Sequence, residues 1–304
     1  MIIRADCSDY WRGVELDPWQ VEDTTDWPEA ADETRGSRAK KWLLGPDGAL
    51  WLRKRPHERQ HYRCEITIEA FAARLSRSLG FDTPVTHVCV DTVGKGVVVR
   101  TCLAEGETFS EGSELLSRVF PNYYDREDRP AHTVAIVHRC LVELESEGAA
   151  GLVEAMLRML AFDAWIGNGD RHQANWGIVY RDSKPTRLAP PFDTSACLGR
   201  ELADAQVNRL LTGQGLDGYI ERCPSGFGNG TTLIKQLELL SDLRRVPEWP
   251  VAIASSVNCF ERALEPAKRY VRNEIPDDWL SPERRELAAL LIDRRLDWLR
   301  RNAP

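Results

Sequence analysis

The sequence has no apolar run that approaches about 18 residues, the length that a helix needs to cross a bilayer. Its beginning, Met1-Ile2-Ile3-Arg4-Ala5-Asp6, also lacks the basic segment and apolar core of a secretory signal peptide. We therefore expect neither a membrane-bound protein nor a secreted one, and we predict a cytoplasmic location.

Closely spaced cysteine pairs are missing too. The eight cysteines lie far apart in the sequence and form no C-x-x-C motif. Zinc knuckles and dithiol redox sites need such spacing, so the sequence supports neither. We interpret the cysteines as buried thiols in a reducing compartment. They are Cys7, Cys64, Cys89, Cys102, Cys140, Cys197, Cys223 and Cys259.

An excess of basic residues is also absent. The net charge is -7, and residues 1–35 carry ten acidic and three basic side chains, so the two signs balance over the rest of the chain. Proteins that bind nucleic acid usually present a broad basic surface, so we predict no direct nucleic-acid partner. The acidic leader, residues 1–35, also holds Trp11, Trp19 and Trp27. Because tryptophan is rarely left in water, we expect the leader to lie on the main body.

The composition is otherwise that of a globular protein, with 42% hydrophobic, 8% aromatic and 29% charged residues over 304 positions. Residues 36–103 show the order strand, strand, helix, strand, strand. The first two strands flank a Gly-Pro-Asp-Gly turn and indicate a hairpin. The helix has apolar residues at the helical period and ends at a glycine. The five segments are 40–44, 49–54, 65–79, 85–90 and 96–100.

Helical patterns dominate the remaining chain, residues 104–304. The last predicted helix opens with Ser281-Pro282-Glu283, a capping serine followed by a first-turn proline. A small β-rich half followed by a larger helical half predicts an α+β fold. The predicted helices are 134–147, 151–166, 232–243, 255–271 and 282–301.

The stretch 165–179 carries the most chemistry. A helix ends near Ile166, a Gly-Asn-Gly-Asp turn follows, and an apolar strand begins after it. Asp170 and Asn175 have the D-x-x-x-x-N spacing of kinase catalytic loops, in which the aspartate orients the acceptor hydroxyl and the asparagine binds magnesium. Asp193 follows another apolar strand, where a second magnesium ligand is expected.

The β-rich half offers groups that could hold the phosphates of ATP. In kinases a lysine positions the α- and β-phosphates, and a glutamate on a neighbouring helix holds that lysine. Lys54 ends the second strand, and either Glu65 or Glu69 on the following helix could be its partner. The segment Gly36-Ser37-Arg38-Ala39-Lys40 could cover the phosphates through its backbone N–H groups.

Taken one at a time, these residues have ordinary structural interpretations. Asp170 could end a helix, Asn175 could form a turn, and Lys54 could be a surface lysine. His172 could be a hydrogen-bonded structural residue or a catalytic one. The complete order of loop, lysine, glutamate, Asp-x-x-x-x-Asn and aspartate is what favours phosphoryl transfer.

Two stretches together resemble the catalytic core of the HipA-like serine/threonine kinases: Ile166 to Asn175 (IGNGDRHQAN) and Leu188 to Thr194 (LAPPFDT). Similarity extends over residues 36–200, although the Asp-Arg-His-x-x-Asn core is shared with phosphatidylinositol kinases. The resemblance implies a bilobal protein-kinase-like fold with a small β-rich N-lobe, residues 36–103. A larger helical C-lobe, residues 104–304, would carry the catalytic and metal-binding loops.

Carried over by position, the resemblance implies an enzyme that uses ATP and Mg²⁺. The catalytic residues predicted on this basis are Asp170, Lys54, Glu69 and His172. The magnesium ligands would be Asn175 and Asp193. The nucleotide would be bound by Gly36, Ser37, Lys40, Lys54, Arg100, Thr101 and Leu103, the last three in a hinge that touches adenine.

Two features depart from the family. The amino-terminal β domain of full-length HipA toxins has no room before a phosphate loop that begins near residue 36. The regulatory serine of those toxins corresponds to Glu33 here, and Thr34 and Ser37 are the nearest hydroxyls for self-phosphorylation.

We predict a serine/threonine protein kinase of the EC 2.7.11 type, which transfers the γ-phosphate of ATP to a protein hydroxyl in toxin or stress regulation. An antitoxin or another regulatory protein would be its partner, and no membrane partner is expected. Two alternatives stay open: a small-molecule or phosphoinositide-type kinase, and a nucleotide-binding pseudokinase. The leader could cover the active site, so that its deletion raises activity, or it could be structural.

Overall fold

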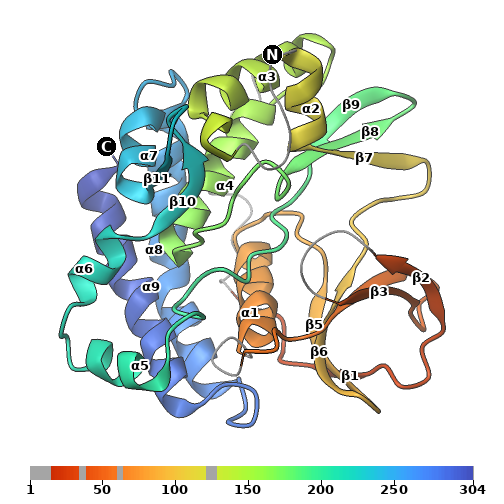
Figure 1. The fold of residues 1–304 in the computed structure, drawn as a ribbon, viewed down its shortest axis with the longest axis vertical. Helices are drawn as coiled ribbons and strands as arrows, with labels where there is room; N and C mark the ends of the chain where they lie inside the picture. The colour runs from red at the N-terminus through yellow and green to blue at the C-terminus, as the bar shows by residue number, and fades with distance from the viewer. Residues whose placement is uncertain (1–14, 34–38, 60–63, 121–128, 304) are drawn as a thin grey trace.

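A computed structural model of the chain describes residues 15–33, 39–59, 64–120 and 129–303. It has a smaller, β-rich lobe and a larger, mainly helical lobe, so the α+β prediction is confirmed (Figure 1). The smaller lobe consists of β1 (Val21–Asp23), β2 (Glu29–Glu33), β3 (Lys40–Leu44), β4 (Leu50–Lys54), α1 (Glu65–Ser78), β5 (Thr86–Asp91) and β6 (Gly94–Arg100). The larger lobe consists of β7 (Glu107–Glu111), α2 (Gly112–Val119), η2 (Arg129–Ala131), α3 (Val134–Ser146), α4 (Leu152–Ile166), β8 (Gly177–Arg181), β9 (Lys184–Leu188), α5 (Asp204–Leu211), α6 (Leu216–Glu221), β10 (Pro224–Gly228), β11 (Leu233–Lys235), α7 (Gln236–Leu243), α8 (Trp249–Asn273) and α9 (Pro282–Asn302).

The smaller lobe is built on one six-stranded sheet of order β1-β5-β6-β4-β3-β2. Its strands pair antiparallel except β1 and β5, which run parallel. The predicted hairpin is β3 and β4, with Lys40 opposite Lys54 in the register. At its turn, the carboxylate of Asp47 accepts hydrogen bonds from Ala49 N at 3.1 Å and Trp51 Nε1 at 3.0 Å. This turn therefore fixes the register that places Lys54.

The sheet begins before residue 36, because both of its edge strands come from the acidic leader. β1 pairs with β5 at one edge and β2 pairs with β3 at the other. As expected for the leader, Trp27 packs edge-on against Trp51 at a centroid distance of 5.6 Å, and Arg74 lies over the ring of Trp19 at 4.9 Å. Trp11 lies outside the described residues.

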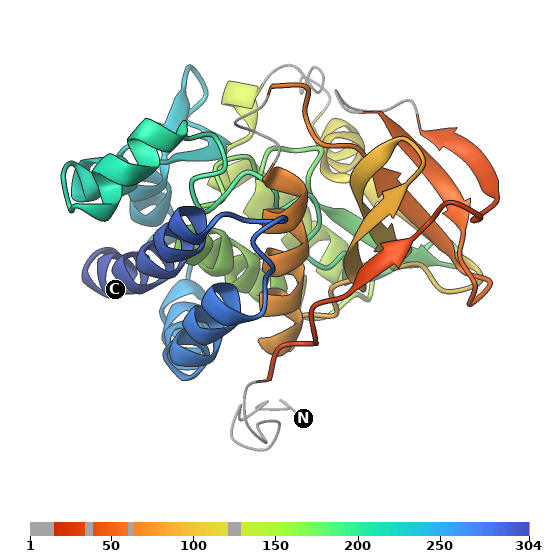
Figure 2. The same ribbon diagram turned by 90° about the horizontal axis from the view of Figure 1, so that it is seen from below.

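Helix α1 lies between the sheet and the helical lobe, as Figure 2 shows. Every residue from Glu65 to Ser76 is buried, because the sheet packs on one side of α1 and α8 on the other. Phe71 stacks on Tyr270 of α8 at a centroid distance of 6.1 Å. Thr67 Oγ1 donates to the carbonyl oxygen of Trp279, between α8 and α9, at 3.0 Å. These contacts attach α1 to the larger lobe.

The core of the larger lobe centres on α4, which is buried along most of its length. Trp165 stacks on Phe260 of α8 at 4.5 Å, and its Nε1 donates to the carbonyl oxygen of Ile292 in α9 at 3.0 Å. Burying an aromatic side chain of this size contributes about 1.5–3 kcal/mol. The helix that precedes the D-x-x-x-x-N loop is thus held from two sides.

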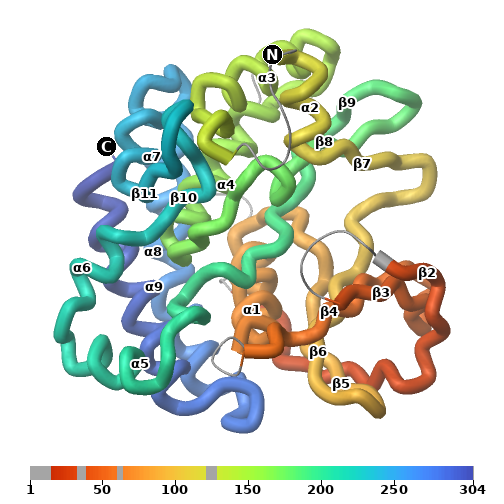
Figure 3. The backbone as a smooth tube through the Cα atoms, viewed as in Figure 1, coloured from red at the N-terminus to blue at the C-terminus, as the bar shows by residue number. Residues whose placement is uncertain are grey.

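A second sheet, of order β7-β8-β9, supports the segments that carry the predicted chemistry. The chain enters it after the connection from β6, which joins the two lobes in Figure 3. The segment 167–176 runs from α4 into β8, and Asp193 follows β9. Both loops are therefore anchored at adjacent strands of one sheet.

The predicted helix 232–243 is wrong at its start. Residues Leu233–Lys235 pair with β10 as strand β11, and α7 begins only at Gln236. The helix predicted over 255–271 is longer, since α8 begins at Trp249 with a proline in its first turn. Over the described ranges, no cysteine forms a disulfide, and no helix is both long and apolar enough to span a bilayer.

Candidate functional site

Lys54 is buried because of its position in β4. Side chains alternate along a strand, and Arg53 and Arg55 both reach Asp91 Oδ2 at 2.5 Å. Lys54 therefore faces the opposite side, toward α1, and only 5% of the residue is exposed. Its Nζ lies 2.5 Å from Oε1 of Glu69, which is also buried.

The two glutamates of α1 have different partners. Glu65 lies one turn before Glu69 and binds Arg200, Oε2 to Nη1, at 2.8 Å. Its other oxygen accepts the backbone N–H of His57 at 2.8 Å. The structure therefore pairs Lys54 with Glu69 and directs Glu65 to the larger lobe.

Asp193 brings the larger lobe to the same lysine. Lys54 Nζ lies 3.2 Å from Asp193 Oδ1. Asp193 has a φ of 50°, in the left-handed region that a residue with a Cβ adopts only at some cost. The preceding residue, Phe192, packs edge-on against Phe109 of β7 at 5.8 Å, which helps to fix this loop.

Arg171 ties the two loops together. Its guanidinium binds both carboxylate oxygens of Asp163 in α4, Nε to Oδ2 at 2.7 Å and Nη2 to Oδ1 at 2.9 Å. Its Nη1 donates to the backbone carbonyl oxygens of Asn175 and Phe192, the latter at 2.9 Å. The residue is fully buried, so this paired and saturated arrangement is what makes its charge tolerable.

Arg171 and Asp163 were not among the site residues predicted from the sequence. An available signal was the carboxylate of Asp163 within the otherwise apolar stretch from Met159 to Ile166 at the end of α4. A buried charge needs a partner, and Arg171 lies eight positions later, in the loop that follows the end of α4 at Ile166.

The D-x-x-x-x-N loop closes on itself. Asn175 Nδ2 donates to the backbone carbonyl oxygen of Asp170 at 2.7 Å. His172 Nδ1 accepts the backbone N–H of Ala174 at 3.2 Å, so in the neutral ring the proton sits on Nε2, 3.9 Å from Asp170 Oδ1. Burial lowers the pKa of His172, while the nearby carboxylates of Asp170 and Asp193 oppose that shift. His172, Asp170 and Asp193 thus belong to one electrostatic cluster.

Asn175 and Asp193 suit magnesium by their chemistry. Because Asn175 uses its amide nitrogen within the loop, its amide oxygen is the atom left to face a cation. Asp193 adds a carboxylate, and Arg171 holds the backbones of both segments. Within the described ranges no group of three or more His, Cys, Asp or Glu side chains could hold a metal. This sparse oxygen set fits magnesium, which takes much of its coordination from water and substrate phosphates.

The predicted nucleotide-binding residues are less closely grouped. Gly36 and Ser37 lie outside the described residues. Arg100 Nε binds Asp47 Oδ2 at 2.8 Å, and hydrogen bonds from Arg100 and Trp51 lower the pKa of Asp47 to about 2. Leu103 N donates to Thr101 Oγ1 at 3.2 Å, in the connection between the lobes. The Arg100 side chain is thus occupied by the β3–β4 turn.

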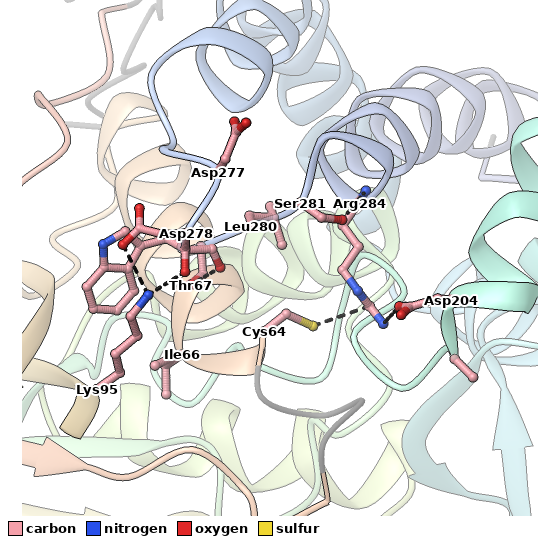
Figure 4. Close-up of a pocket in the computed structure, with 12 residues that line it drawn as sticks. Cys64, Ile66, Thr67, Lys95, Asp204, Asp277, Asp278, Leu280, Ser281 and Arg284 are labelled. Atoms are coloured by element: carbon pink, nitrogen blue, oxygen red, sulfur yellow. Dashed lines mark hydrogen bonds and ion pairs between the residues drawn. The ribbon is translucent and has the colours of Figure 1, made fainter. Parts of the chain in front are cut away.

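A cavity of about 740 Å³ lies elsewhere, between the start of α1 and the connection of α8 to α9 (Figure 4). It includes none of the predicted site residues. Its charged groups bind one another: Lys95 Nζ lies 3.2 Å from Asp278 Oδ2, and Arg284 Nη2 lies 3.1 Å from Asp204 Oδ1. We therefore place the candidate site at Lys54 and Asp193.

Comparison with known sequences gives a family. The family model described as the HipA-like C-terminal domain matches residues 29–209. The protein Y4dM of Sinorhizobium fredii, which its name assigns provisionally to the kinases, is 29% identical over 161 residues, 48% of this chain and 37% of that protein. The serine/threonine-protein kinase CtkA of Helicobacter pylori is 36% identical over 55 residues, 18% of this chain and 17% of that protein. The chain thus matches well under half the length of these relatives.

Solved structures are similar over nearly the whole chain. The proinflammatory kinase CtkA of Helicobacter pylori matches with a TM-score of 0.73 and 16% identity, over 93% of this chain and 98% of that one. HipA of Shewanella oneidensis, solved with HipB and operator DNA, matches with a TM-score of 0.57 and 13% identity, over 94% and 70%. At these identities the likeness shows the fold, and the predicted bilobal kinase-like fold is confirmed.

Proposed function

The chain belongs to the family of HipA-like C-terminal domains, and from this premise we propose that it is an ATP- and magnesium-dependent protein kinase. The observation that carries the proposal is the meeting of Lys54 with both Glu69 and Asp193. Phosphoryl transfer needs a lysine that binds phosphate next to a carboxylate that binds the metal. Lys54 and Asp193 have this arrangement, and Glu69 is the partner that positions the lysine.

Each residue of the candidate site has its own role in the proposed reaction. Lys54 binds the α- and β-phosphates, and Glu69 holds its ammonium group in place. Asp170 accepts the proton of the acceptor hydroxyl while that oxygen bonds to the γ-phosphorus. The bond from the γ-phosphorus to the bridging oxygen breaks, and ADP leaves with its electron pair. Magnesium, when held by Asn175 and Asp193, neutralises charge on the phosphates.

Serine or threonine in a protein is the acceptor that we propose. Support comes from the similarity to CtkA, whose name states this specificity. A regulatory protein partner is the second part of the proposal, supported by the similarity to HipA, which was solved together with HipB. Self-phosphorylation at Thr34 or Ser37 stays a prediction, and both residues lie outside the described ranges.

The test compares the wild-type chain with Asp170→Asn and Asp193→Asn. Radiolabelled ATP and magnesium are offered with a protein extract and, separately, with a metabolite pool. We expect labelled phosphoserine or phosphothreonine with the wild-type chain and a loss of about 100-fold or more in both variants. Asp204→Asn is the matched control, because its carboxylate lies at the cavity of Figure 4 and should leave transfer unchanged.

Three results would contradict the proposal. Label that appears only in metabolites indicates a small-molecule kinase. Binding of ATP measured by calorimetry, without transfer to any acceptor, indicates a pseudokinase. Full activity in either variant shows that the assigned residues do not do the chemistry. A loss of activity supports the proposal only in a variant that circular dichroism shows to be folded.

A further inference from the structure

The carboxylate of Asp170 has a cationic neighbour, Arg129, which lies outside the D-x-x-x-x-N motif. Arg129 Nη1 lies 3.2 Å from Asp170 Oδ1. The two side chains are 44% and 38% exposed, so both can meet a substrate. Arg129 is the first residue of η2, far from the D-x-x-x-x-N loop in the sequence.

The backbone that follows Arg129 is fixed by strand β10. Gly230 N donates to the carbonyl oxygen of Pro130, and Gly228 N donates to that of His132, each at 2.9 Å. A Cβ at Gly228 would lie 2.2 Å from the Pro130 oxygen, so only glycine permits this approach. The position of Arg129 is therefore set by a close fit between η2 and β10.

A buried histidine connects this turn to the D-x-x-x-x-N loop. His132 Nε2 accepts a hydrogen bond from Trp176 Nε1 at 3.0 Å, and its Nδ1 donates to the carbonyl oxygen of Gly226 at 3.2 Å. Trp176 directly follows Asn175, and its ring stacks on His132 at 6.2 Å. Phe227 packs on the same imidazole at 4.1 Å. The segments that carry Arg129 and Asp170 thus pack against the same buried side chains.

We propose that Arg129 is a further catalytic residue, which binds the phosphoryl group as it passes to the acceptor; this rests on the proposed function. An acceptor hydroxyl that gives its proton to Asp170 lies about 2.6–3.2 Å from that carboxylate. A guanidinium 3.2 Å from the same carboxylate is within reach of the phosphoryl group that bonds to this hydroxyl oxygen. Its planar fork of N–H donors matches phosphoryl oxygens.

Proton transfer itself would direct Arg129 to the phosphoryl group. As the acceptor oxygen bonds to phosphorus and the bridging bond to ADP breaks, the hydroxyl proton moves to Asp170. The carboxylate is then neutral and holds the guanidinium less strongly, while negative charge gathers on the transferred group. Arg129 exchanges one anionic partner for another at this point, and stabilises the transition state.

The experiment measures ADP release from Mg-ATP and transfer to dephosphorylated casein. In Arg129→Gln we expect kcat to fall about 100-fold, with unchanged affinity for ADP by calorimetry, since ADP lacks the group that Arg129 binds. Arg129→Lys should recover part of the loss, because it keeps the charge without the fork. Millimolar guanidinium chloride should raise the rate of Arg129→Ala. Arg245→Gln is the control, because its ion pair with Asp242 lies at an exposed site.

Other results overturn the inference. A faster Arg129→Gln enzyme would show that the ion pair blocks Asp170 in the resting state. An unchanged rate would show an ordinary exposed ion pair. If the wild-type chain itself releases no ADP, the proposed function fails as well. Wild-type activity together with an unaffected Arg129→Gln variant overturns this inference alone.

Discussion

Lys54 on the six-stranded sheet and Asp193 after β9 lie 3.2 Å apart, Nζ to Oδ1, although they are 139 positions apart in the chain. Because Glu69 reaches the same Nζ from α1, three separate elements meet at one ammonium group. The position of Lys54 therefore depends on the packing of both lobes.

We predict that the Lys54–Glu69 pair behaves as a coupled buried ion pair. Lys54→Met should lower the free energy of unfolding by about 3 kcal/mol, because it leaves a buried carboxylate without its cation. The double variant Lys54→Met/Glu69→Gln should lose less free energy of unfolding than the sum of the losses in the two single variants. Urea unfolding measures all four proteins. Strict additivity would show that the pair contributes no coupling, and Lys184→Met, at an exposed position of β9, serves as the control.

Arg171 should resist even a conservative replacement. In Arg171→Lys, the three donors of a single ammonium nitrogen cannot reproduce the four hydrogen bonds that the guanidinium makes to Asp163 and two backbone carbonyls. We expect a loss of about 1–3 kcal/mol in the free energy of unfolding, because lysine keeps the charge but leaves buried acceptors without a donor. Magnesium-dependent ATP binding should weaken too, since the loops of Asn175 and Asp193 lose their common anchor. Arg139→Lys, which keeps an exposed pair with Glu143, should cost nothing measurable.

Stability should fall as the pH drops below about 6.5. Burial lowers the pKa of His132 from 6.5 to about 3 and that of His87 to about 4. The unfolded chain therefore takes up protons in this window that the folded chain does not, and the stabilisation present above pH 6.5 is lost toward pH 3. For the fully buried His132 the slope approaches about 1.4 kcal/mol per pH unit between its two pKa values. The half-buried His87 contributes less, because solvent screens its charge. Urea midpoints at pH 7, 6 and 5 measure this slope, and His132→Gln should flatten it. An equal slope in that variant would contradict the assignment.

Deletion of residues 1–35 should destabilise the protein rather than activate it. The deletion removes both edge strands of the sheet and exposes β5 and β3 as new edges, which favours aggregation. It also removes Asp17, whose carboxylate binds Arg77 at 2.8 Å and whose backbone oxygen accepts from Tyr270 at 2.8 Å.

Tyr270→Phe is the milder test of the same contact and should cost about 1 kcal/mol. Thermal unfolding and ADP release are measured on both variants. A folded deletion variant with raised activity would show instead that the leader covers the active site.

The sequence was informative where local chemistry decides the structure. The hairpin followed from Pro46-Asp47-Gly48, and α1 and α9 followed from their periodicity and end signals. Strand β2 could not be found this way, because Glu29–Glu33 is acidic and poor in strand-forming residues. Its acidic residues lie beside lysines of β3, with Glu33 opposite Lys40 in the register and Lys41 Nζ 2.7 Å from Glu29 Oε2. That complementarity is visible only once the strands are adjacent.

The candidate site divides in the same way. Asp170 and Asn175 were predicted from their spacing, Asp193 from its place after an apolar strand, and Lys54 from its place at a strand end. The choice between Glu65 and Glu69 needed the structure, because both lie on α1 one turn apart and only packing directs one to Arg200. Arg129 carries no local signal at all, since the contact that places it beside Asp170 comes from β10.

The attachment of α1 limits how such an enzyme could be controlled. Thr67, Phe71 and Glu65 fasten the helix to the larger lobe through a hydrogen bond, a ring stack and an ion pair. An outward rotation of α1 that separates Glu69 from Lys54 would break all three contacts. It would also expose to solvent a helix that is buried for three turns. Active and inactive states would therefore differ in whether the nucleotide and the acceptor can enter the site. The ion pair of Lys54 and Glu69 would be present in both states.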